Sequence, residues 1–415
     1  MSDSMRRIFI WKGYHDQTMF DFFKLCWDKN YLLVCCPPNL KDFSFIDSLP
    51  EGDISLCGQW PDTKPLIKAA SKKTAYPETP ILGVFTTGTS REKPRLVLYS
   101  KTNITSCHNA IFSLFDISRI RQVYCYPQPY HVFGILLGYA ACHLKKWRLV
   151  VPEGRYNADH HRYFTEKVSS ETISLFTPTH LNDLSRYLVT NKIKPTKSYS
   201  CIIGGAKVMT SDWHNAKTIA NIDQPSIGYG CTEASPGISH LAPGVKPTQD
   251  GEVGSTLPSV NLELFGKKGL EFSGPSLAMA TIESGKVSFL KKMKLNDQLS
   301  RRNNGSMVFN TRTDNILNRG GEKFALEEIE SFIKMSHKVE SICVPVTHSR
   351  LGLELGVVIQ SSSKLKKATL YKSLESKFGK KFSVQNYIET DQLPVNDQAK
   401  LDRKAAKAMF KQNKT

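Results

Sequence analysis

A hydroxyl-rich glycine loop, Thr86-Thr87-Gly88-Thr89-Ser90, is the strongest local chemical signal in the sequence. It follows an apolar run that ends at Phe85, and three cations, the last of them Arg95, separate it from a second apolar run at Leu96 to Tyr99. Hydroxyls, flexible backbone N–H groups and cations are suited to wrapping phosphate oxygens. The segment is not a Walker loop, because no Gly-Lys-Ser/Thr follows at the required spacing. Standing alone, it is more often a polar hairpin turn.

Further motifs follow this loop in a fixed order, and their order is more specific than any one of them. They are Tyr126-Pro127-Gln128-Pro129-Tyr130-His131-Val132-Phe133-Gly134, Gly204-Gly205-Ala206, Gly228-Tyr229-Gly230-Cys231-Thr232-Glu233, Arg312-Thr313-Asp314-Asn315 through Gly320-Gly321-Glu322 to Glu328-Ile329-Glu330, Leu393-Pro394, and Ala399-Lys400-Leu401-Asp402-Arg403. This order resembles the adenylate-forming superfamily of acyl-CoA synthetases, peptide-synthetase adenylation domains and luciferases. The resemblance covers about residues 80 to 415.

The resemblance implies a reaction in which a carboxylate and MgATP form an acyl-adenylate and pyrophosphate. Many such enzymes then pass the acyl group to a thiol, so ATP, Mg²⁺ and coenzyme A are the implied cofactors and co-substrates. The residue types suit this chemistry, because attack on the α-phosphorus places negative charge on phosphate oxygens. Cations, a metal and oriented donors must be in place to stabilise that charge.

By the resemblance, most of the ATP site lies before residue 240. Thr232 would bind the α-phosphate and Glu233 the Mg²⁺, while the ring of Tyr229 would stack on adenine. Arg95 replaces a lysine of the family loop and can still serve a phosphate as a fixed fork. The β- and γ-phosphates would be held by Thr86, Thr87, Gly88, Thr89 and Ser90, and the floor under adenine and the acyl group would be Gly204, Gly205 and Ala206.

The remaining implied residues lie towards the C-terminus. Asp297 would grip the ribose hydroxyls with help from Arg312, although an aspartate in Asn-Asp-Gln is more often a turn residue. Asp314 would be the hinge of a mobile C-terminal domain, and Lys400 would reach the α-phosphate and the carboxylate. A lysine on a basic tail is, taken singly, more often solvated. In the thiol-transfer pose Gly320 and Gly321 would line the CoA channel.

Within the superfamily, Tyr130 to Gly134, Val253 to Pro258 and the Asp314 segment look most like o-succinylbenzoate–CoA ligases of menaquinone and phylloquinone synthesis. The alternatives are another aryl or acyl acid–CoA ligase, or an adenylation enzyme that loads a carrier protein. The acid pocket should be lined by His131, Phe133 and the segment from Gly228 through Ser235 to Gly237. His131 could instead only pack at the start of a helix.

Several positions depart from the family pattern. The phosphate loop lacks its second glycine and has one residue more, Thr311 and Ala399 stand where the family has glycine, and the stretch before the loop is about half the usual length. A slow or degenerate enzyme is therefore an alternative.

The elements that must position these residues are alternating apolar runs and helical patterns from about residue 18 to 231. They include predicted helices at Thr102 to Asp116 and Val132 to Leu144 and predicted strands at Tyr31 to Cys36 and Thr172 to Thr177. This alternation predicts an α/β fold with mostly parallel sheets flanked by helices, and active sites at the carboxyl ends of the strands. Gly-rich, strand-like pieces after Pro236, the first from Gly251 to Leu264, predict a β-rich layer. We expect a large N-terminal AMP-binding domain over residues 1–313, with a shortened N-terminal subdomain, and a small mobile α+β domain over residues 314–415.

Composition sets the broad class. A chain of 415 residues with 40% hydrophobic and 23% charged residues is globular, and it has room for two or three domains. Lysine and arginine exceed aspartate and glutamate by 56 to 38, so polyanions are attractive partners, and a nucleic-acid-binding protein is the competing class. Because no recognition helix or aromatic-basic RNA motif is present, we expect no nucleic acid as a partner. The resemblance implies a small carboxylic acid, ATP and CoA as partners, and an oligomer is possible.

The ten cysteines include no Cys-x-x-Cys pair and fall partly in apolar runs, which predicts reduced core thiols. The first eleven residues have no signal-peptide pattern, and no apolar run approaches 18 residues. We therefore expect a cytoplasmic protein that spans no membrane.

Overall fold

The structure of the protein is a computed structural model. It describes residues 7–40, 43–58, 69–70, 75–86, 95–319, 322–348, 351–360, 365–379, 382–383, 385–396 and 400–412. The chain divides into two compact units. The first comprises residues 1–263, 271–294 and 301–308, and the second comprises residues 264–270, 295–300 and 309–415.

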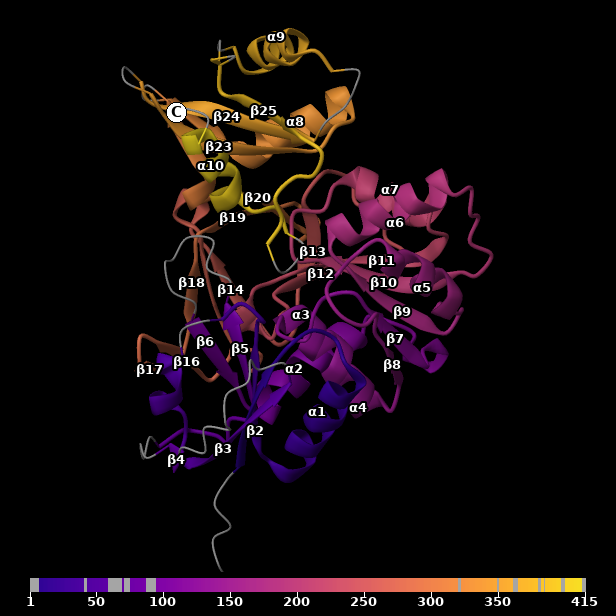
Figure 1. The fold of residues 1–415 in the computed structure, drawn as a ribbon, viewed down its shortest axis with the longest axis vertical. Coiled ribbons are helices and arrows are strands. Elements are labelled where there is room, and N and C mark those ends of the chain that lie inside the picture. The colour runs from indigo at the N-terminus through magenta and orange to yellow at the C-terminus, as the bar shows by residue number, and fades with distance from the viewer. Residues whose placement is uncertain are drawn as a thin grey trace, which may run out of the picture. The chain divides into compact units, whose positions relative to one another are not determined.

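An eight-stranded mixed sheet forms one part of the first unit (Figure 1). Its order is β17-β16-β6-β5-β2-β1-β3-β4, and its parallel pairs are β1 with β2, β1 with β3, and β2 with β5. All five residues of β2 are buried, as is typical of parallel strands covered on both faces. The strands are β1 (Arg7–Lys12), β2 (Leu32–Cys36), β3 (Gly52–Gly58), β4 (Ala69–Ala70), β5 (Leu82–Thr86), β6 (Arg95–Tyr99), β16 (Ala280–Glu283) and β17 (Lys286–Phe289).

A second sheet of the first unit runs in the order β13-β12-β11-β10-β9-β7-β8. The five strands from β11 to β8 are parallel, whereas β12 and β13 pair antiparallel. The carboxyl ends of the parallel strands therefore meet at one edge, where ligands bind in such sheets. The strands are β7 (Gln122–Cys125), β8 (Arg148–Val150), β9 (Thr172–Phe176), β10 (Tyr199–Gly204), β11 (Ile222–Tyr229), β12 (Ser239–Leu241) and β13 (Glu252–Thr256).

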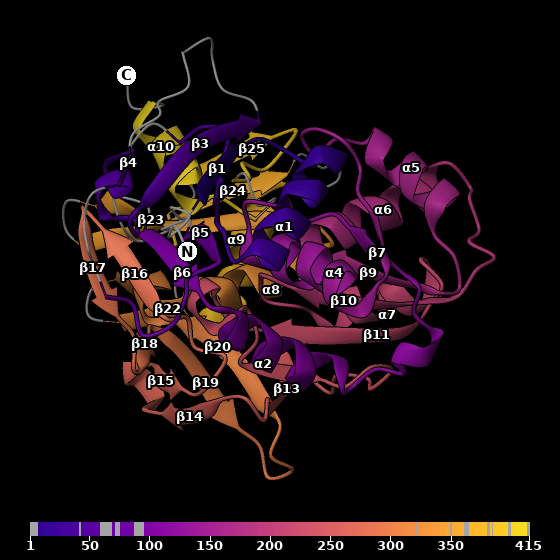
Figure 2. The ribbon, with the colours of Figure 1, turned by 90° about the horizontal axis from the view of Figure 1, so that it is seen from below.

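Helices cover both faces of this second sheet. Helices α1, α2 and the α3–α4 segment lie between the two sheets, while α5, α6 and α7 pack on the outer side of the second sheet (Figures 1 and 2). Side chains cap several of these helices; Ser100 and Asn103, for example, form a capping box at α2. The helices are α1 (Gln17–Lys29), α2 (Lys101–Phe112), α3 (Val132–Gly134), a π-helix (Ile135–Ala140), α4 (Ala141–Lys145), α5 (Asp159–Lys167), α6 (Pro178–Thr190) and α7 (Thr210–Thr218).

Five further strands lie, in the sequence, close to the residues at which the chain passes from one unit to the other. A three-stranded sheet has the order β14-β15-β18, and β20 pairs with β13 through Met307 and Val308. The strands are β14 (Asn261–Leu264), β15 (Leu270–Ser273), β18 (Met293–Leu295), β19 (Asp297–Arg301) and β20 (Met307–Arg312).

The second unit has its own α+β core. Helices α8 and α9 pack on the sheet β23-β24-β25 in one apolar cluster, and α10 packs on the sheet in another that contains Ala406. The elements are β21 (Ile316–Arg319), β22 (Glu322–Ala325), α8 (Leu326–His337), β23 (Ser341–His348), β24 (Gly352–Gln360), α9 (Lys367–Phe378), β25 (Tyr387–Thr390) and α10 (Arg403–Gln412).

Some local expectations are corrected. The helix expected over Val132 to Leu144 has a π-helical middle, and the one expected to reach Asp116 ends at Phe112. The continuous strand-like piece expected from Gly251 to Leu264 is two strands, because the chain turns between them at Leu257 to Val260.

The cysteines are free thiols, and eight are buried, as expected, whereas Cys57 and Cys231 are only half-buried. Among the described residues, no helix has both the length and the apolar character needed to cross a bilayer.

Candidate functional site

The predicted phosphate loop joins two antiparallel strands. Thr86 is the last residue of β5 and pairs in register with Arg95, the first residue of β6. The backbone N–H of Arg95 donates to Oγ1 of Thr86 at 3.3 Å. Both anchors of the loop are thus fixed, while its predicted phosphate ligands Thr87, Gly88, Thr89 and Ser90 lie outside the described residues.

The last of the three cations after the loop, Arg95, contacts the predicted metal ligand. The guanidinium of Arg95 donates through Nη2 to Oε1 of Glu233 in an ion pair whose side chains are 13% and 5% exposed. Within the described part of the chain, Nε of Arg95 has no hydrogen-bond partner. The structure therefore brings together two predicted catalytic residues that are 138 positions apart in the sequence.

A short turn after β11 presents Thr232 and Glu233. The turn is the 3₁₀ segment Thr232–Ala234, and the backbone N–H of Ala278 donates to the carbonyl of Glu233 at 2.8 Å. The turn needs Gly230, because a Cβ there would lie 1.6 Å from the carbonyl oxygen of Pro236. The hydroxyl of Ser235 is fully buried and has no partner among the described residues.

Tyr99 is a support for this turn that the sequence analysis missed. Its hydroxyl donates to the carbonyl oxygen of Thr232 at 2.6 Å, so β6 fixes both residues of the turn. Burial, the largest cause, and the nearby Glu233 hold the pKa of Tyr99 well above its usual value, so the phenol stays a donor. Strand alternation could have revealed it, because Arg95 and Tyr99 are four residues apart and share a face.

Gly204, predicted with Gly205 and Ala206 to form the floor, is paired with Gly228, which was predicted to line the acid pocket; we refer to these two paired glycines as the glycine floor. Gly204 ends β10 and pairs in register with Gly228 of β11. A Cβ on Gly204 would lie 2.9 Å from the carbonyl of Gly228 and 3.8 Å from Cζ of Phe133, so Phe133 lies beside the floor. The next residue, Gly205, has φ +84° and is exposed, as is Ala206. The structure thus brings Gly204, Gly228 and Phe133 together; Tyr229 follows at the end of β11.

A buried polar network holds the segment that carries His131 and Phe133. The side chain of Gln128 accepts from the backbone N–H of His15 at 3.0 Å and donates to the carbonyl of Gly154 at 3.1 Å. Gln128 also accepts, through its carbonyl, from the backbone N–H of His131 at 3.0 Å. His131 is 5% exposed, and its ring lies edge-on to Tyr130 with centroids 4.3 Å apart. The position of His131 at the start of α3 is thus fixed by its backbone.

The predicted ribose ligands belong to the second unit, where they contact each other. Nη1 of Arg312 lies 2.9 Å from Oδ1 of Asp297, and the aspartate is buried. The backbone N–H of Thr313 donates to the carbonyl of Asn296 at 2.7 Å, which holds the two chain segments together. The carboxylate is thereby oriented by a cation.

The segment around the predicted hinge Asp314 is held by one carboxylate of the second unit. Glu327 accepts from the hydroxyl of Thr311 at 2.7 Å and from the side-chain amide of Asn315 at 2.5 Å, and it lies 3.5 Å from Nη2 of Arg403. Asp314 itself lies in a 3₁₀ turn, Thr313–Asn315. The predicted CoA-channel residues Gly320 and Gly321 lie outside the described residues.

Lys400 lies in a tight loop before α10. Its backbone N–H donates to Oδ1 of Asn396 at 3.1 Å, and its carbonyl accepts from the N–H of Asn396 at 2.8 Å. Three residues later Arg403 donates to both oxygens of Glu330 and to the carbonyl of Cys343. These bonds fix the base of the loop that carries the lysine within the second unit.

The side chains of the predicted site fit Mg²⁺ only if the ion binds together with nucleotide phosphates. Glu233 offers a buried carboxylate, and the described residues contain no group of three or more His, Cys, Asp or Glu side chains placed to hold a metal ion. Mg²⁺ in nucleotide sites commonly uses one or two carboxylates plus phosphate oxygens and water. Glu233 would hold the ion from the protein side.

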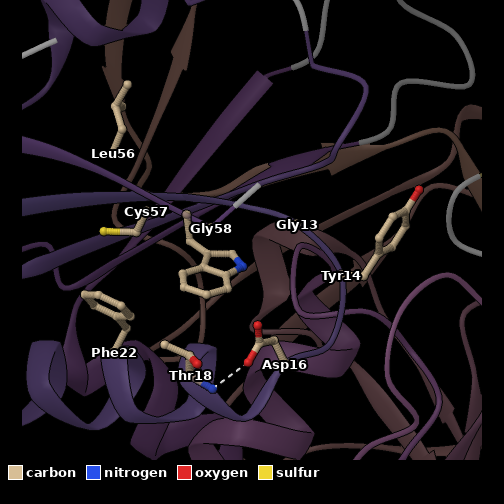
Figure 3. A pocket seen from close by; sticks show the side chains of 9 residues that line it. Gly13, Tyr14, Asp16, Thr18, Phe22, Leu56, Cys57 and Gly58 are labelled. Carbon is tan, nitrogen blue, oxygen red and sulfur yellow. Dashed lines mark hydrogen bonds between the residues drawn. The ribbon is translucent and has the colours of Figure 1, made fainter. Parts of the chain in front are cut away.

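A separate cavity of about 440 Å³ lies where β1 and β3 end (Figure 3). Phe22 and Leu56 give it apolar walls, and the Asp16 carboxylate at its edge caps α1 by accepting from the N–H of Thr18 at 2.7 Å. None of the predicted site residues is among those that line it, so we assign it no part in the site.

Comparisons with known proteins bear on the family and the fold of the chain. The family model described as "AMP-binding enzyme" matches residues 43–275. A curated relative, a 2-hydroxy-7-methoxy-5-methyl-1-naphthoate–CoA ligase of Streptomyces carzinostaticus, is 28% identical over 116 residues, which is 27% of this chain and 21% of that enzyme. The matched stretch is therefore a minor part of that relative.

Solved structures share the fold along almost the whole chain. ATP-bound MatB from Rhodopseudomonas palustris superposes with a TM-score of 0.77 at 13% identity, covering 100% of this chain and 90% of that one. An E. coli MenE variant with bound OSB-AMS gives 0.75 at 16% identity, covering 99% and 89%. The o-succinylbenzoate CoA synthetase of Bacillus subtilis, in complex with its acyl-adenylate OSB-AMP, gives 0.73 at 15% identity, covering 97% and 88%.

These likenesses show that the fold is that of adenylate-forming enzymes. Since the family model also covers more than half of the chain and contains both Arg95 and Glu233, the protein belongs to the AMP-binding enzyme family.

Proposed function

We propose that the protein is an ATP-dependent carboxylate–CoA ligase that works through an acyl-adenylate, with o-succinylbenzoate as the leading candidate acid. The observation that carries the proposal is the buried pair formed by Arg95, the first residue of β6, and Glu233, on the turn directly after β11. A fixed cation and a fixed carboxylate at one point are what a magnesium-bound triphosphate requires. The proposal takes that point as the phosphate site.

In the proposed site the protein acts mainly by positioning charged side chains next to the phosphates and the metal ion. Arg95 and the loop hydroxyls would bind phosphate oxygens, and Glu233 would hold Mg²⁺, which neutralises charge on the phosphates when bound. The buried setting of the pair strengthens these interactions relative to water. Because Gly204 and Gly228 have no side chains, the floor places no side chain of its own between the backbone and a bound flat group, which suits both adenine and an aromatic acid.

The choice of an aromatic acid rests on relatives. One of the similar solved structures holds OSB-AMS and another the acyl-adenylate OSB-AMP, and the curated relative is a naphthoate–CoA ligase. Phe133 beside the floor supports the same class, because an aromatic edge packs well against a flat ring. Another aryl or acyl acid remains the alternative substrate.

The second unit would take part in both half-reactions. Lys400 would reach the α-phosphate during adenylation, and after rotation at Asp314 the segment with Gly320 and Gly321 would admit the CoA thiol. The excess of basic residues would serve the phosphates of ATP and CoA. We place the reaction in the cytoplasm, as a step of quinone biosynthesis.

Acid-dependent ATP–pyrophosphate exchange tests this function. The panel should contain o-succinylbenzoate, benzoate, naphthoates, short fatty acids and amino acids, and acyl-CoA formation should be followed by chromatography. We expect exchange with o-succinylbenzoate and formation of its CoA thioester. Exchange without any thioester would favour a carrier-protein acceptor, and absence of exchange with every acid would refute the ligase function.

A further inference from the structure

A buried histidine, His240, lies next to the glycine floor. It is on β12 and pairs in register with Gly228 of β11, so the two positions share a face of the sheet. A Cβ on Gly228 would find Cε1 of His240 at 3.3 Å and Nδ1 at 3.5 Å as its nearest atoms. Because Gly204 pairs with Gly228 on the other side, the three residues form a row across β10, β11 and β12.

The ring of His240 has hydrogen-bonding capacity that the described residues do not use. The side chain is 4% exposed, and Nε2 has no hydrogen-bond partner in the described part of the chain. Burying such a nitrogen unpaired is unfavourable, and in native proteins an unpaired buried group usually has a role. Gly228 beside it is only half-buried, so the row of three residues is not sealed from the surface.

Apolar groups lie beside the ring of His240, while the residue in register with it on the next strand, β13, is Ser255. The ring of Phe115 lies edge-on to the His240 ring with centroids 6.1 Å apart, and a methyl of Ile202 lies 3.5 Å from the Cβ position on Gly228. Burial lowers the pKa of His240 to about 4, so the imidazole is neutral at pH 7 and offers one N–H donor and one acceptor. A charged group of a ligand next to the His240 ring would lose its hydration and gain no countercharge.

We propose that His240 is a specificity-determining residue that hydrogen-bonds a neutral polar group, a carbonyl or a hydroxyl, on the body of the acid above Gly228. The inference rests on the proposed ligase function and narrows its substrate class. The acid is then one that carries a ketone or hydroxyl in addition to the reacting carboxylate. The ketone of o-succinylbenzoate satisfies this requirement, while its second carboxylate must lie away from His240.

A pair of acids that differ only in this group tests the proposal. We would compare o-succinylbenzoate with the analogue whose ketone is reduced to a methylene, measuring kcat/KM for pyrophosphate exchange. The wild type should prefer the ketone by about tenfold, the worth of one hydrogen bond between neutral groups. His240→Leu should treat both acids alike within about twofold, with an unchanged KM for ATP, and His240→Gln should keep part of the preference.

A matched control is His160→Leu. His160 on α5 is 5% exposed and also has a ring nitrogen without a partner in the described part of the chain, but it is not near Gly228 in the sheet. It should keep the full wild-type preference. Equal loss of preference in His160→Leu, or an unchanged preference in His240→Leu, would overturn the role of His240 while leaving the ligase function standing.

A measurement on the wild type covers the case in which the His240 variants do not fold. The ring ¹⁵N shifts of the histidines would be recorded with and without each acid in the presence of a non-hydrolysable ATP analogue. We expect a shift at the ring buried in β12 with the ketone acid and none with the methylene analogue; the same spectrum with both acids would refute the proposal. If no acid of the panel supports exchange, the ligase function fails and this inference fails with it.

Discussion

Neutralising Glu233 should destabilise the first unit and stop adenylation, for the same structural reason. The carboxylate is 5% exposed and its partner Arg95 is 13% exposed, so Glu233→Gln leaves a guanidinium buried without a countercharge. Breaking a buried pair in this way costs about 3–5 kcal/mol. We take about 3 kcal/mol, because Arg95 keeps some access to water, and this corresponds to a shift of about 1 M in the urea midpoint for an m-value near 3 kcal/mol/M.

The double variant makes the prediction quantitative. Removing both charges in Arg95→Met/Glu233→Gln should return the free energy of unfolding to within about 1 kcal/mol of wild type. Exchange activity should fall about 10²–10³-fold in the single Glu233→Gln variant and should not recover in the double variant, since both groups would act on ATP.

Tryptophan fluorescence reports the right part of the molecule, because all five tryptophans lie in residues 11–213, within the first unit. Glu166→Gln is the control, since Glu166 is 58% exposed and lies 4.0 Å from an exposed arginine, so its loss should change stability by less than about 0.5 kcal/mol. A Glu233→Gln midpoint equal to that of the control would refute the buried pair. If the free energy of unfolding falls in the double variant by the sum of the decreases in the two single variants, the two charges do not interact.

Arg95→Ala should raise the KM for ATP and slow exchange, while Arg95→Lys should keep part of the activity because the charge survives; equal rates in all three proteins would place the phosphate cation elsewhere. Lys400→Ala should abolish acyl-adenylate formation yet convert supplied acyl-adenylate to the thioester at close to the normal rate, and equal slowing of both steps would make Lys400 structural. Asp314→Pro, which restricts the backbone to φ near −65°, should spare adenylation and impair thiol transfer, as single-turnover assays of each step would show. Tyr99→Phe removes the hydroxyl that donates to Thr232 and should cost about 1 kcal/mol in urea unfolding and several-fold in exchange; an unchanged exchange rate would show that the turn does not need this bond.

The elements best predicted from the sequence are buried parallel strands. Leu32–Cys36 is buried on both faces and is an unbroken apolar run, whereas Thr172–Phe176, equally buried, contains two small polar residues, Thr172 and Ser174, among its apolar ones. Both strands are bounded by helical patterns. The strand Arg7–Lys12 was missed, because its charged ends hide the short apolar centre. The π-helix Ile135–Ala140 could not be anticipated, since all six residues are buried and an all-apolar segment has no periodicity to distinguish one helix type from another.

The motifs identify the candidate site residues one by one, but they do not predict which of these residues contact each other. Arg95 and Glu233 are joined only because β6 and the turn after β11 belong to different sheets that meet there, which no spacing in the sequence reveals. No sequence motif marks His240 as a site residue, because its proposed role depends on the register that pairs β12 with Gly228 of β11. The roles of Thr87, Ser90 and the other loop positions outside the described residues stay predictions, as do the roles assigned to Asp314 and Lys400.

If the second unit rotates at Asp314 as predicted, the hydrogen bonds of the Glu327 carboxylate oppose that rotation. The carboxylate accepts from Thr311 on one side of Asp314 and from Asn315 on the other, and Thr311 supplies a hydroxyl where the family pattern has glycine. Any backbone rotation at Asp314 that separates Thr311 from Asn315 must break at least one of these bonds. A hydrogen bond to a charged acceptor contributes about 1.5–3 kcal/mol, so the rotated state should be populated roughly ten- to a hundredfold less than with glycine at position 311. This chain should therefore exchange between conformations less readily than a glycine-containing relative, and its turnover should be limited by that exchange.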